Sequence, residues 1–154
     1  MDFNVGGFHA ALAVVGDPIL RKTLQCLSPH CHSEWGDGSP LDVFNRLLAK
    51  NISPQGLTKW THADVRESQI LSRHERWTTQ QLAVLQRGHT DPTGQDFTCP
   101  IVLAELDGVT RVLDGNHRIN RWVLNGDTRM HDVHIHAVTS GVGFSEKVAL
   151  LHGA

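Results

Sequence analysis

The sequence contains little that would place the protein in or across a membrane. No apolar run approaches the roughly 20 residues that a transmembrane helix needs. The first residues, Met1–Val5, lack the basic segment that begins a signal peptide, so the apolar stretch Ala10–Val15 is a poor candidate for one. We therefore expect a cytoplasmic protein without a membrane partner.

Cysteine and net charge are also scarce. The three cysteines, Cys26, Cys31 and Cys99, form an odd set in a chain of 154 residues, which is long enough to fold around a core without disulfides. We therefore expect reduced cysteines in an intracellular setting, with Cys99 as a small buried residue. The net charge of −2 at pH 7 provides no overall attraction to nucleic acid.

The chain has no internal repeat and no low-complexity segment, and its length suits one compact unit. Residues 1–56 are expected to form a helical N-terminal extension, with helices over Pro18–Leu27 and Leu41–Lys50 joined by the turn-rich segment Ser28–Pro40. Residues 57–154 are expected to form the main domain.

Strand-like and helix-like segments alternate in that domain. We predict strands over Lys59–Val65, Pro100–Leu106, Val109–Leu113 and Asp132–Val138, with Asp107-Gly108 as a tight hairpin turn. We predict helices over Ser68–His74, from a Thr78 cap to Arg87, from Asn116 to Asn125, and over Ser145–Leu151. These elements predict an α+β or α/β fold in which a small mixed β-sheet is flanked by helices.

The segment Asp114–Arg118 lies where the strand Val109–Leu113 passes into a helix. The first backbone N–H groups of a helix have no intrahelical partner, and the helix dipole places partial positive charge there. Arg118 adds a guanidinium fork that matches phosphate, and His117 adds a donor near neutral pH. The segment predicts a phosphate-binding site, the alternative being a tight turn with a helix cap.

Residues from about 59 to 138 resemble the ParB/sulfiredoxin-like superfamily, which includes ParB N-terminal domains, ParB-like nucleases, sulfiredoxin and free-serine kinases. Arg66–Gln69 is similar to the Arg-Pro-Ser-Gln segment that follows the first strand, and the helix before Gly88 resembles the one that precedes the central hairpin. Pro100–Val102 matches the Pro-Ile-Val strand start. Asp114–Arg118 resembles the Asp-Gly-His-His-Arg box that binds nucleotide phosphates.

The sequence also departs from particular members of this superfamily. Glu67 stands in place of the proline, and the Gly-Glu-Arg-Arg box of CTP-hydrolysing ParB proteins is missing. Asn116 occupies the position of the cysteine that sulfiredoxin uses, so sulfiredoxin redox repair is not expected.

The resemblance implies an enzyme that binds nucleotide phosphates and performs phosphoryl transfer or nucleotide hydrolysis, with ATP, ADP or CTP as the nucleotide and Mg²⁺ as the metal. The phosphate ligands would be Asp114, Gly115, Asn116, His117 and Arg118. Glu67 and His117 would be catalytic, with Gln69 and Arg73 in the same cleft. An exposed glutamate at a helix start is more commonly just a favourable partner for the helix dipole, and this alternative applies to Glu67.

Two other functions remain open. The box would also suit a ParB-like nuclease or nucleic-acid-binding protein, whose basic patch would comprise Arg66, Arg73, Arg76, Arg87, Arg111, Arg118 and Arg121. The third function is a non-catalytic regulatory protein that contacts a partner through its N-terminal third. The acceptor of any phosphoryl group is a small molecule or a nucleic acid.

The chain has 11 histidines, which raises the question of a metal site. Cys26, His30, Cys31 and His32 are close in sequence, but their spacing matches no standard zinc site. His131, His134 and His136 lie on or beside the strand Asp132–Val138, where His134 and His136 share one face. We expect a half-exposed polar strand face there, the alternative being a divalent metal site.

Overall fold

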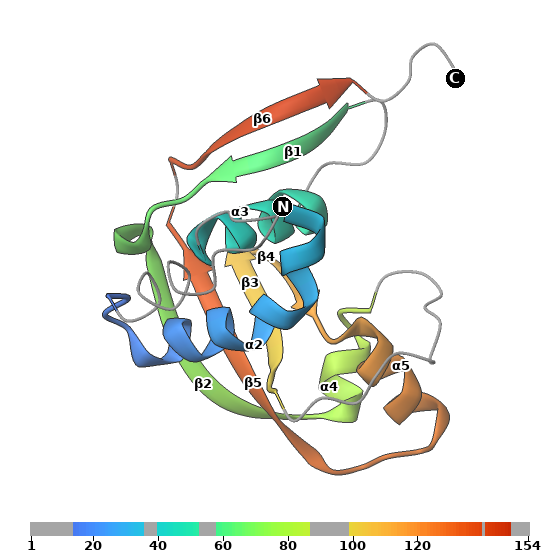
Figure 1. Cartoon of the computed structure of the whole chain (residues 1–154). Coiled ribbons are helices and arrows are strands. Elements are labelled where there is room, and N and C mark those ends of the chain that lie inside the picture. Colours follow the sequence, from blue (N-terminus) through green and yellow to red (C-terminus); the bar gives the residue numbers. More distant parts are fainter. Residues whose placement is uncertain (1–13, 36–39, 53–57, 87–98, 140, 149–154) are drawn as a thin grey trace.

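The computed structural model describes residues 14–35, 40–52, 58–86, 99–139 and 141–148 (Figure 1). Its helices are α2 (Pro18–Trp35), α3 (Pro40–Ile52), the 3-10 turn η1 (Glu67–Gln69), α4 (Thr79–Ala83) and α5 (Asn116–Leu124). Its strands are β1 (Thr58–Asp64), β2 (Ile70–Thr78), β3 (Ile101–Leu106), β4 (Val109–Asp114), β5 (Met130–Val138) and β6 (Gly143–Val148). None of the described helices is long and apolar enough to cross a membrane.

The strands form two sheets. The main sheet has four strands in the order β2-β5-β3-β4, in which β3 and β5 are parallel and the other pairs antiparallel. A second sheet pairs β1 with β6 and lies over α3 in Figure 1. The protein therefore has the α+β architecture with a small mixed sheet that the sequence predicts.

Helices cover both faces of the main sheet. Leu82 of α4 and Ile119 of α5 pack against Leu103 and Ile135 on one face. The opposite face is covered by α2 and α3, whose buried residues include Leu20, Leu24, Phe44 and Leu48. The described part of the N-terminal extension thus belongs to the same hydrophobic core as the sheet.

The helix α2 is longer than predicted. Asp17 Oδ1 accepts hydrogen bonds from the backbone N–H groups of Ile19 and Leu20 and so caps its first turn. The helix then continues to Trp35, so the predicted loop over Ser28–Pro40 is wrong for its first eight residues. Because most helix stability comes from packing an apolar face, the buried preceding turns override the turn-forming composition.

Two predicted helices are strands. The segment Ser68–His74 was expected to be helical, but η1 ends at Gln69 and β2 pairs residue by residue with β5. The tail segment Ser145–Leu151 was also expected to be helical, and its described residues belong to β6. Both strands obtain their hydrogen bonds from distant segments, and such pairing overrides weak local propensity.

The central elements agree with the prediction. Asp107 and Gly108 have positive φ angles of 51° and 78°, as a two-residue hairpin turn between β3 and β4 requires. Thr78 caps α4 by accepting a hydrogen bond from Gln81 N at 3.1 Å. That helix ends at Ala83 instead of Arg87, and the helix-terminating Gly88 lies outside the described residues.

Candidate functional site

Gly115 makes the turn from β4 into α5. Its φ angle is 115°, and its carbonyl accepts the first helical hydrogen bond, from Ile119 N at 2.9 Å. A Cβ at this position would collide with Ile101 Cδ1 of β3. The glycine is therefore required by the backbone conformation, and a Cβ would also displace the tip of the buried Ile101 side chain.

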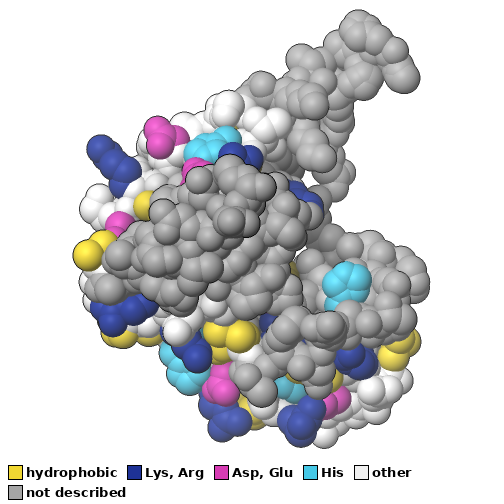
Figure 2. Space-filling view, viewed as in Figure 1, with side chains coloured by type: hydrophobic (Ala, Val, Ile, Leu, Met, Phe, Trp, Pro, Cys, Tyr) yellow, Lys and Arg dark blue, Asp and Glu magenta, His cyan; other side chains and the backbone are white. Residues whose placement is uncertain are grey.

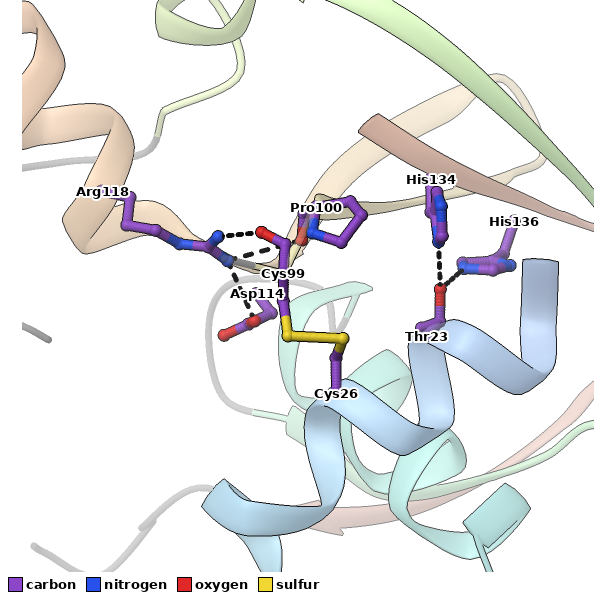
Figure 3. Close-up of a disulfide and its surroundings, with 8 residues drawn as sticks. All are labelled: Thr23, Cys26, Cys99, Pro100, Asp114, Arg118, His134 and His136. Carbon is purple, nitrogen blue, oxygen red and sulfur yellow. Dashed lines mark hydrogen bonds and ion pairs between the residues drawn. A yellow bond between two sulfur atoms is a disulfide. The ribbon is translucent and has the colours of Figure 1, made fainter. Parts of the chain in front are cut away.

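Arg118 is buried behind this turn, with 4% of its surface exposed. Its guanidinium donates to Asp114 Oδ2 at 3.2 Å and to the backbone carbonyls of Cys99 and Pro100 (Figure 3). The group predicted to bind phosphate thus already holds the chain that enters β3. Its first role in this structure is positional.

A pocket of about 210 Å³ lies beside Arg118. It is lined by Cys99, Pro100, Ile101, Arg118, Trp122, Arg129, Met130, His131 and Asp132. Drug-sized ligands usually occupy at least about 300 Å³. The pocket is therefore smaller than a typical site for a drug-sized ligand.

One wall of the pocket is a stacked pair of rings. Trp122 and His131 lie 3.7 Å apart between ring centres, with 6° between their planes. The His131 Nε2 atom is 2.8 Å from Thr79 Oγ1. Burial lowers the pKa of His131 below its ordinary value, so the ring is neutral at pH 7 before a ligand binds.

The other charged groups on the pocket wall are accessible. Arg129 pairs with Asp127 Oδ2 at 2.6 Å, yet its side chain is 72% exposed. The hydrogen bond from Arg129 lowers the pKa of Asp127. Asp132 is also exposed, and its Oδ1 atom lies 2.9 Å from His74 Nε2. These side chains are the ones a ligand would meet first.

The structure does not bring Glu67 and Gln69 to the box. They precede β2, whose first residue Ile70 pairs with Val138 near the end of β5. The box instead lies near the start of β3, where Ile101 pairs with Val133 of β5. Val133 and Val138 are about 16 Å apart along β5, and this distance separates the two ends of the sheet. Glu67 Oε2 instead accepts from Gly16 N at 3.0 Å, and Gln69 Oε1 from Arg66 N at 2.9 Å.

Arg73 is also engaged elsewhere. Its guanidinium donates to both carboxylate oxygens of Glu105, at 3.1 and 2.8 Å, and to Glu75 at 2.7 Å. The hydrogen bond to Glu105 is the main cause that raises the pKa of Arg73. Arg73 was predicted from the sequence to lie in the phosphate cleft, but the structure places it on the sheet surface among carboxylates.

The remaining box residues form the turn from β4 into α5. Asn116 and His117 form the first turn of α5, with His117 exposed and Asn116 half-buried, and Asp114 ends β4. Of the five box residues, Arg118 alone appears in the pocket lining.

The histidine face of β5 is buried, contrary to the expectation of a half-exposed polar face. Thr23 Oγ1 lies 3.0 Å from His134 Nδ1 and 2.8 Å from His136 Nε2, and Ser72 Oγ lies 2.7 Å from His136 Nδ1. Burial under α2 lowers the pKa of His134 and lowers that of His136 to about 3. Among the described side chains, no group of three potential ligands is placed to hold a metal ion.

Cys26 and Cys99 form a disulfide. The expectation of reduced cysteines is therefore wrong for this pair, since the fold brings α2 against the start of β3 (Figure 3). The zinc alternative loses Cys26 to this bond, and the side chains of His30, Cys31 and His32 lie outside the described residues.

The arginines proposed for a basic patch are interspersed with carboxylates. Arg73 pairs with Glu105, and Arg76 lies 3.8 Å from Asp132. On the face shown in Figure 2, basic, acidic and histidine side chains alternate along the lower edge. Arg87 lies outside the described residues.

Three residues of the pocket were not predicted from the sequence as site residues, Trp122, Arg129 and Asp132, and His131 was considered only as a metal ligand. Their only local signal is the cluster of charged and aromatic residues at the end of α5 and the start of β5. No protein-family model matches the chain, and no curated protein or solved structure is detectably similar to it.

Proposed function

We propose that the protein belongs to the ParB/sulfiredoxin-like superfamily and binds a phosphate-bearing ligand of the nucleotide class in the pocket beside α5. The observation that carries the proposal is a pocket that brings Arg118 of α5 together with Arg129 and His131, which lie around the start of β5. Guanidinium groups bind phosphate through paired, charge-assisted hydrogen bonds. The Trp122 ring adds a flat apolar wall suited to a sugar or base.

The order of elements supports the family resemblance. Pro100 directly precedes β3, a tight hairpin joins β3 to β4, and Gly115 begins α5. These are the places at which the resemblance puts the Pro-Ile-Val strand, the hairpin and the phosphate box. Since that box binds nucleotide phosphates in the superfamily, ATP, ADP and CTP are the ligands to test.

The two arginines take different roles in this proposal. Arg118 is tied to Asp114 and to the chain before β3, so it shapes the pocket wall. Arg129 donates to Asp127 Oδ2 from Nε and Nη2, and its side chain is 72% exposed although that of Asp127 is only 10% exposed. A phosphate group can therefore engage Arg129 directly, which makes this residue the main phosphate ligand.

We further propose that the reaction is phosphoryl transfer or nucleotide hydrolysis, with Asp132 orienting the acceptor or water. Asp132 is on the pocket wall and is held by His74, whereas Glu67 is at the other end of the sheet. One carboxylate together with ligand phosphates suits Mg²⁺, which would share the phosphate charge.

Thermal unfolding with inorganic phosphate, ATP, ADP or CTP, with and without Mg²⁺, tests binding. A ligand that binds the folded state raises Tm. We expect at least one nucleotide to stabilise the wild type and Arg129→Ala to lose this shift. The matched control Arg66→Ala, which removes an exposed cation at the other end of the sheet, should keep it. A wild type that no nucleotide stabilises would exclude the proposal.

Two further measurements separate the alternatives. Salt-sensitive binding of a DNA or RNA oligonucleotide, stronger than that of nucleotides, would favour the nucleic-acid function. Phosphate release from bound nucleotide measures turnover, which Asp132→Asn should lower about 100-fold while the ligand-induced shift remains. Glu67→Gln should keep its turnover. Binding without turnover by the wild type would indicate the regulatory function.

A further inference from the structure

The Cys26–Cys99 disulfide joins α2 to the wall of the pocket (Figure 3). The two cysteines are 73 residues apart in sequence, and their Cα atoms are 6.0 Å apart. Cys99 lines the pocket, and its backbone carbonyl accepts a hydrogen bond from Arg118. The same residue therefore carries both the covalent link to α2 and an anchor of the buried guanidinium.

The two ends of the disulfide are held differently. Cys26 is buried in α2 between Leu24 and Leu27, which are also buried. Thr23, one helical turn earlier, bonds to His134 and His136 of β5. These contacts keep α2 on the sheet without the disulfide. The Cys99 end precedes β3 and is half-buried, so it is the end that opening the bond would release.

We propose that Cys26–Cys99 is a thiol–disulfide exchange site that sets the affinity of the pocket, with the oxidised form as the binding form and a small dithiol as the reductant. This proposal rests on the ligand-binding function proposed above. In the oxidised form, the disulfide and Arg118 together fix the position of Cys99. In the reduced form, the link to α2 is lost and the pocket wall is less constrained.

The difference in burial between Cys26 and Cys99 decides which sulfur the reductant attacks. A thiolate of the reductant attacks Cys99 Sγ, since Cys99 is half-buried whereas Cys26 is buried. The disulfide breaks, and Cys26 leaves as a thiolate that takes a proton from solvent. The second thiol of the reductant then attacks the mixed disulfide as a thiolate, so Cys99 leaves and is protonated. Two electrons pass to the protein, and the reductant becomes a cyclic disulfide.

The test is a redox titration of the whole chain in buffers of reduced and oxidised dithiothreitol. Alkylation and peptide mapping report the state of each cysteine, and far-UV circular dichroism reports folding. We expect Cys26 and Cys99 to be reduced together in a folded protein, with the Kd for ATP or ADP raised about tenfold. Cys99→Ser should show the weak affinity in every buffer. The matched control Cys31→Ser should titrate like the wild type.

Several results would overturn the proposal. Loss of secondary structure on reduction would make the disulfide a structural crosslink. Equal affinity of the oxidised and reduced forms for ATP or ADP would leave ligand binding intact but remove its redox control. If neither form binds phosphate or nucleotide, the proposed function fails by itself. The redox proposal is then tested by the fluorescence emission of Trp122, because this ring lines the pocket. The contribution of Trp122 is identified by comparing the wild type with Trp122→Phe. A change on reduction supports the site, and an unchanged emission overturns it.

Discussion

The guanidinium of Arg118 donates to the backbone carbonyl of Cys99, 19 residues earlier in the chain, and so ties the first turn of α5 to the entry of β3 (Figure 3). Asp114 shares the same guanidinium. A cation this buried is stable only when its donors are paired. The box therefore holds the β4–α5 turn against β3, and the pocket beside it depends on that contact.

Replacing Arg118 with alanine should destabilise the fold strongly. The change leaves the Asp114 carboxylate and two backbone carbonyls without their donor, so we expect the free energy of unfolding to fall by about 3 kcal/mol. Urea unfolding measures this. Arg118→Lys keeps the charge but loses the planar fork, and should lie between alanine and wild type. A change of less than about 0.5 kcal/mol would mean that Arg118 behaves as a surface residue.

The elements with a clear local signal were predicted, whereas β2 and β6, which become strands by pairing with distant segments, were not. The apolar run of β3 and the Asp107-Gly108 turn are sufficient to define the central hairpin. The strand β2 lies at a sheet edge and exposes polar residues such as Arg73 and His74, so it lacks the apolar alternation of a half-buried strand. Its pairing with β5 makes it a strand.

The candidate site divides in the same way. The turn at Gly115 is readable because a glycine before a helix start is a local signal. The approach of Arg129 and Asp132 to Arg118 cannot be predicted from local sequence, because it depends on β5 running parallel to β3 in the sheet. Glu67 was assigned from its order along the chain, whereas the strand register places it at the opposite end.

The buried histidines predict a loss of stability in mild acid. His136 is 0% exposed, and burial lowers its pKa to about 3, with the pKa values of His131 and His134 also lowered. The unfolded chain therefore binds more protons than the folded chain below pH 6.5. For His136 the free energy of unfolding should fall as pH drops from 6.5 towards 3, by up to about 1.4 kcal/mol per pH unit, and the lowered pKa values of His131 and His134 act in the same direction.

Urea unfolding of the wild type and His136→Gln between pH 7 and pH 4 tests whether His136 causes the loss of stability in acid. The variant should be less stable at pH 7, by about 1–3 kcal/mol, because Thr23 and Ser72 lose the hydrogen bonds they share with the His136 ring. Its stability should also depend less steeply on pH. An identical slope in the two proteins would assign the acid sensitivity to other groups.

The close approach of Gly115 and Ile101 predicts a steric coupling. Gly115→Ala should cost at least about 2 kcal/mol, since it adds strain at a φ of 115° to a collision with Ile101 Cδ1. The matched control Gly126→Ala, with a φ of 67° and open space around the new Cβ, should cost only about 1 kcal/mol. Urea unfolding compares the two.

Ile101→Val removes the colliding Cδ1 atom and tests the cause. In the Gly115→Ala background it should recover part of the lost stability, whereas in the wild type it should destabilise by about 1 kcal/mol as an ordinary core truncation. A double-mutant cycle measures the difference. Purely additive effects would mean that the backbone strain alone explains the need for glycine.

The contact of Arg73 with Glu105 predicts a structural surface role for a residue that the sequence placed in the phosphate cleft. Both side chains are more than a quarter exposed, so Arg73→Ala should lower the free energy of unfolding by less than about 1 kcal/mol. Because Arg73 does not line the pocket, the nucleotide-induced change in Tm should equal that of the wild type. Thermal unfolding of Arg73→Ala beside Arg129→Ala measures both effects. A variant of Arg73 that loses the ligand shift while keeping its stability would place the phosphate on β2 instead of beside α5.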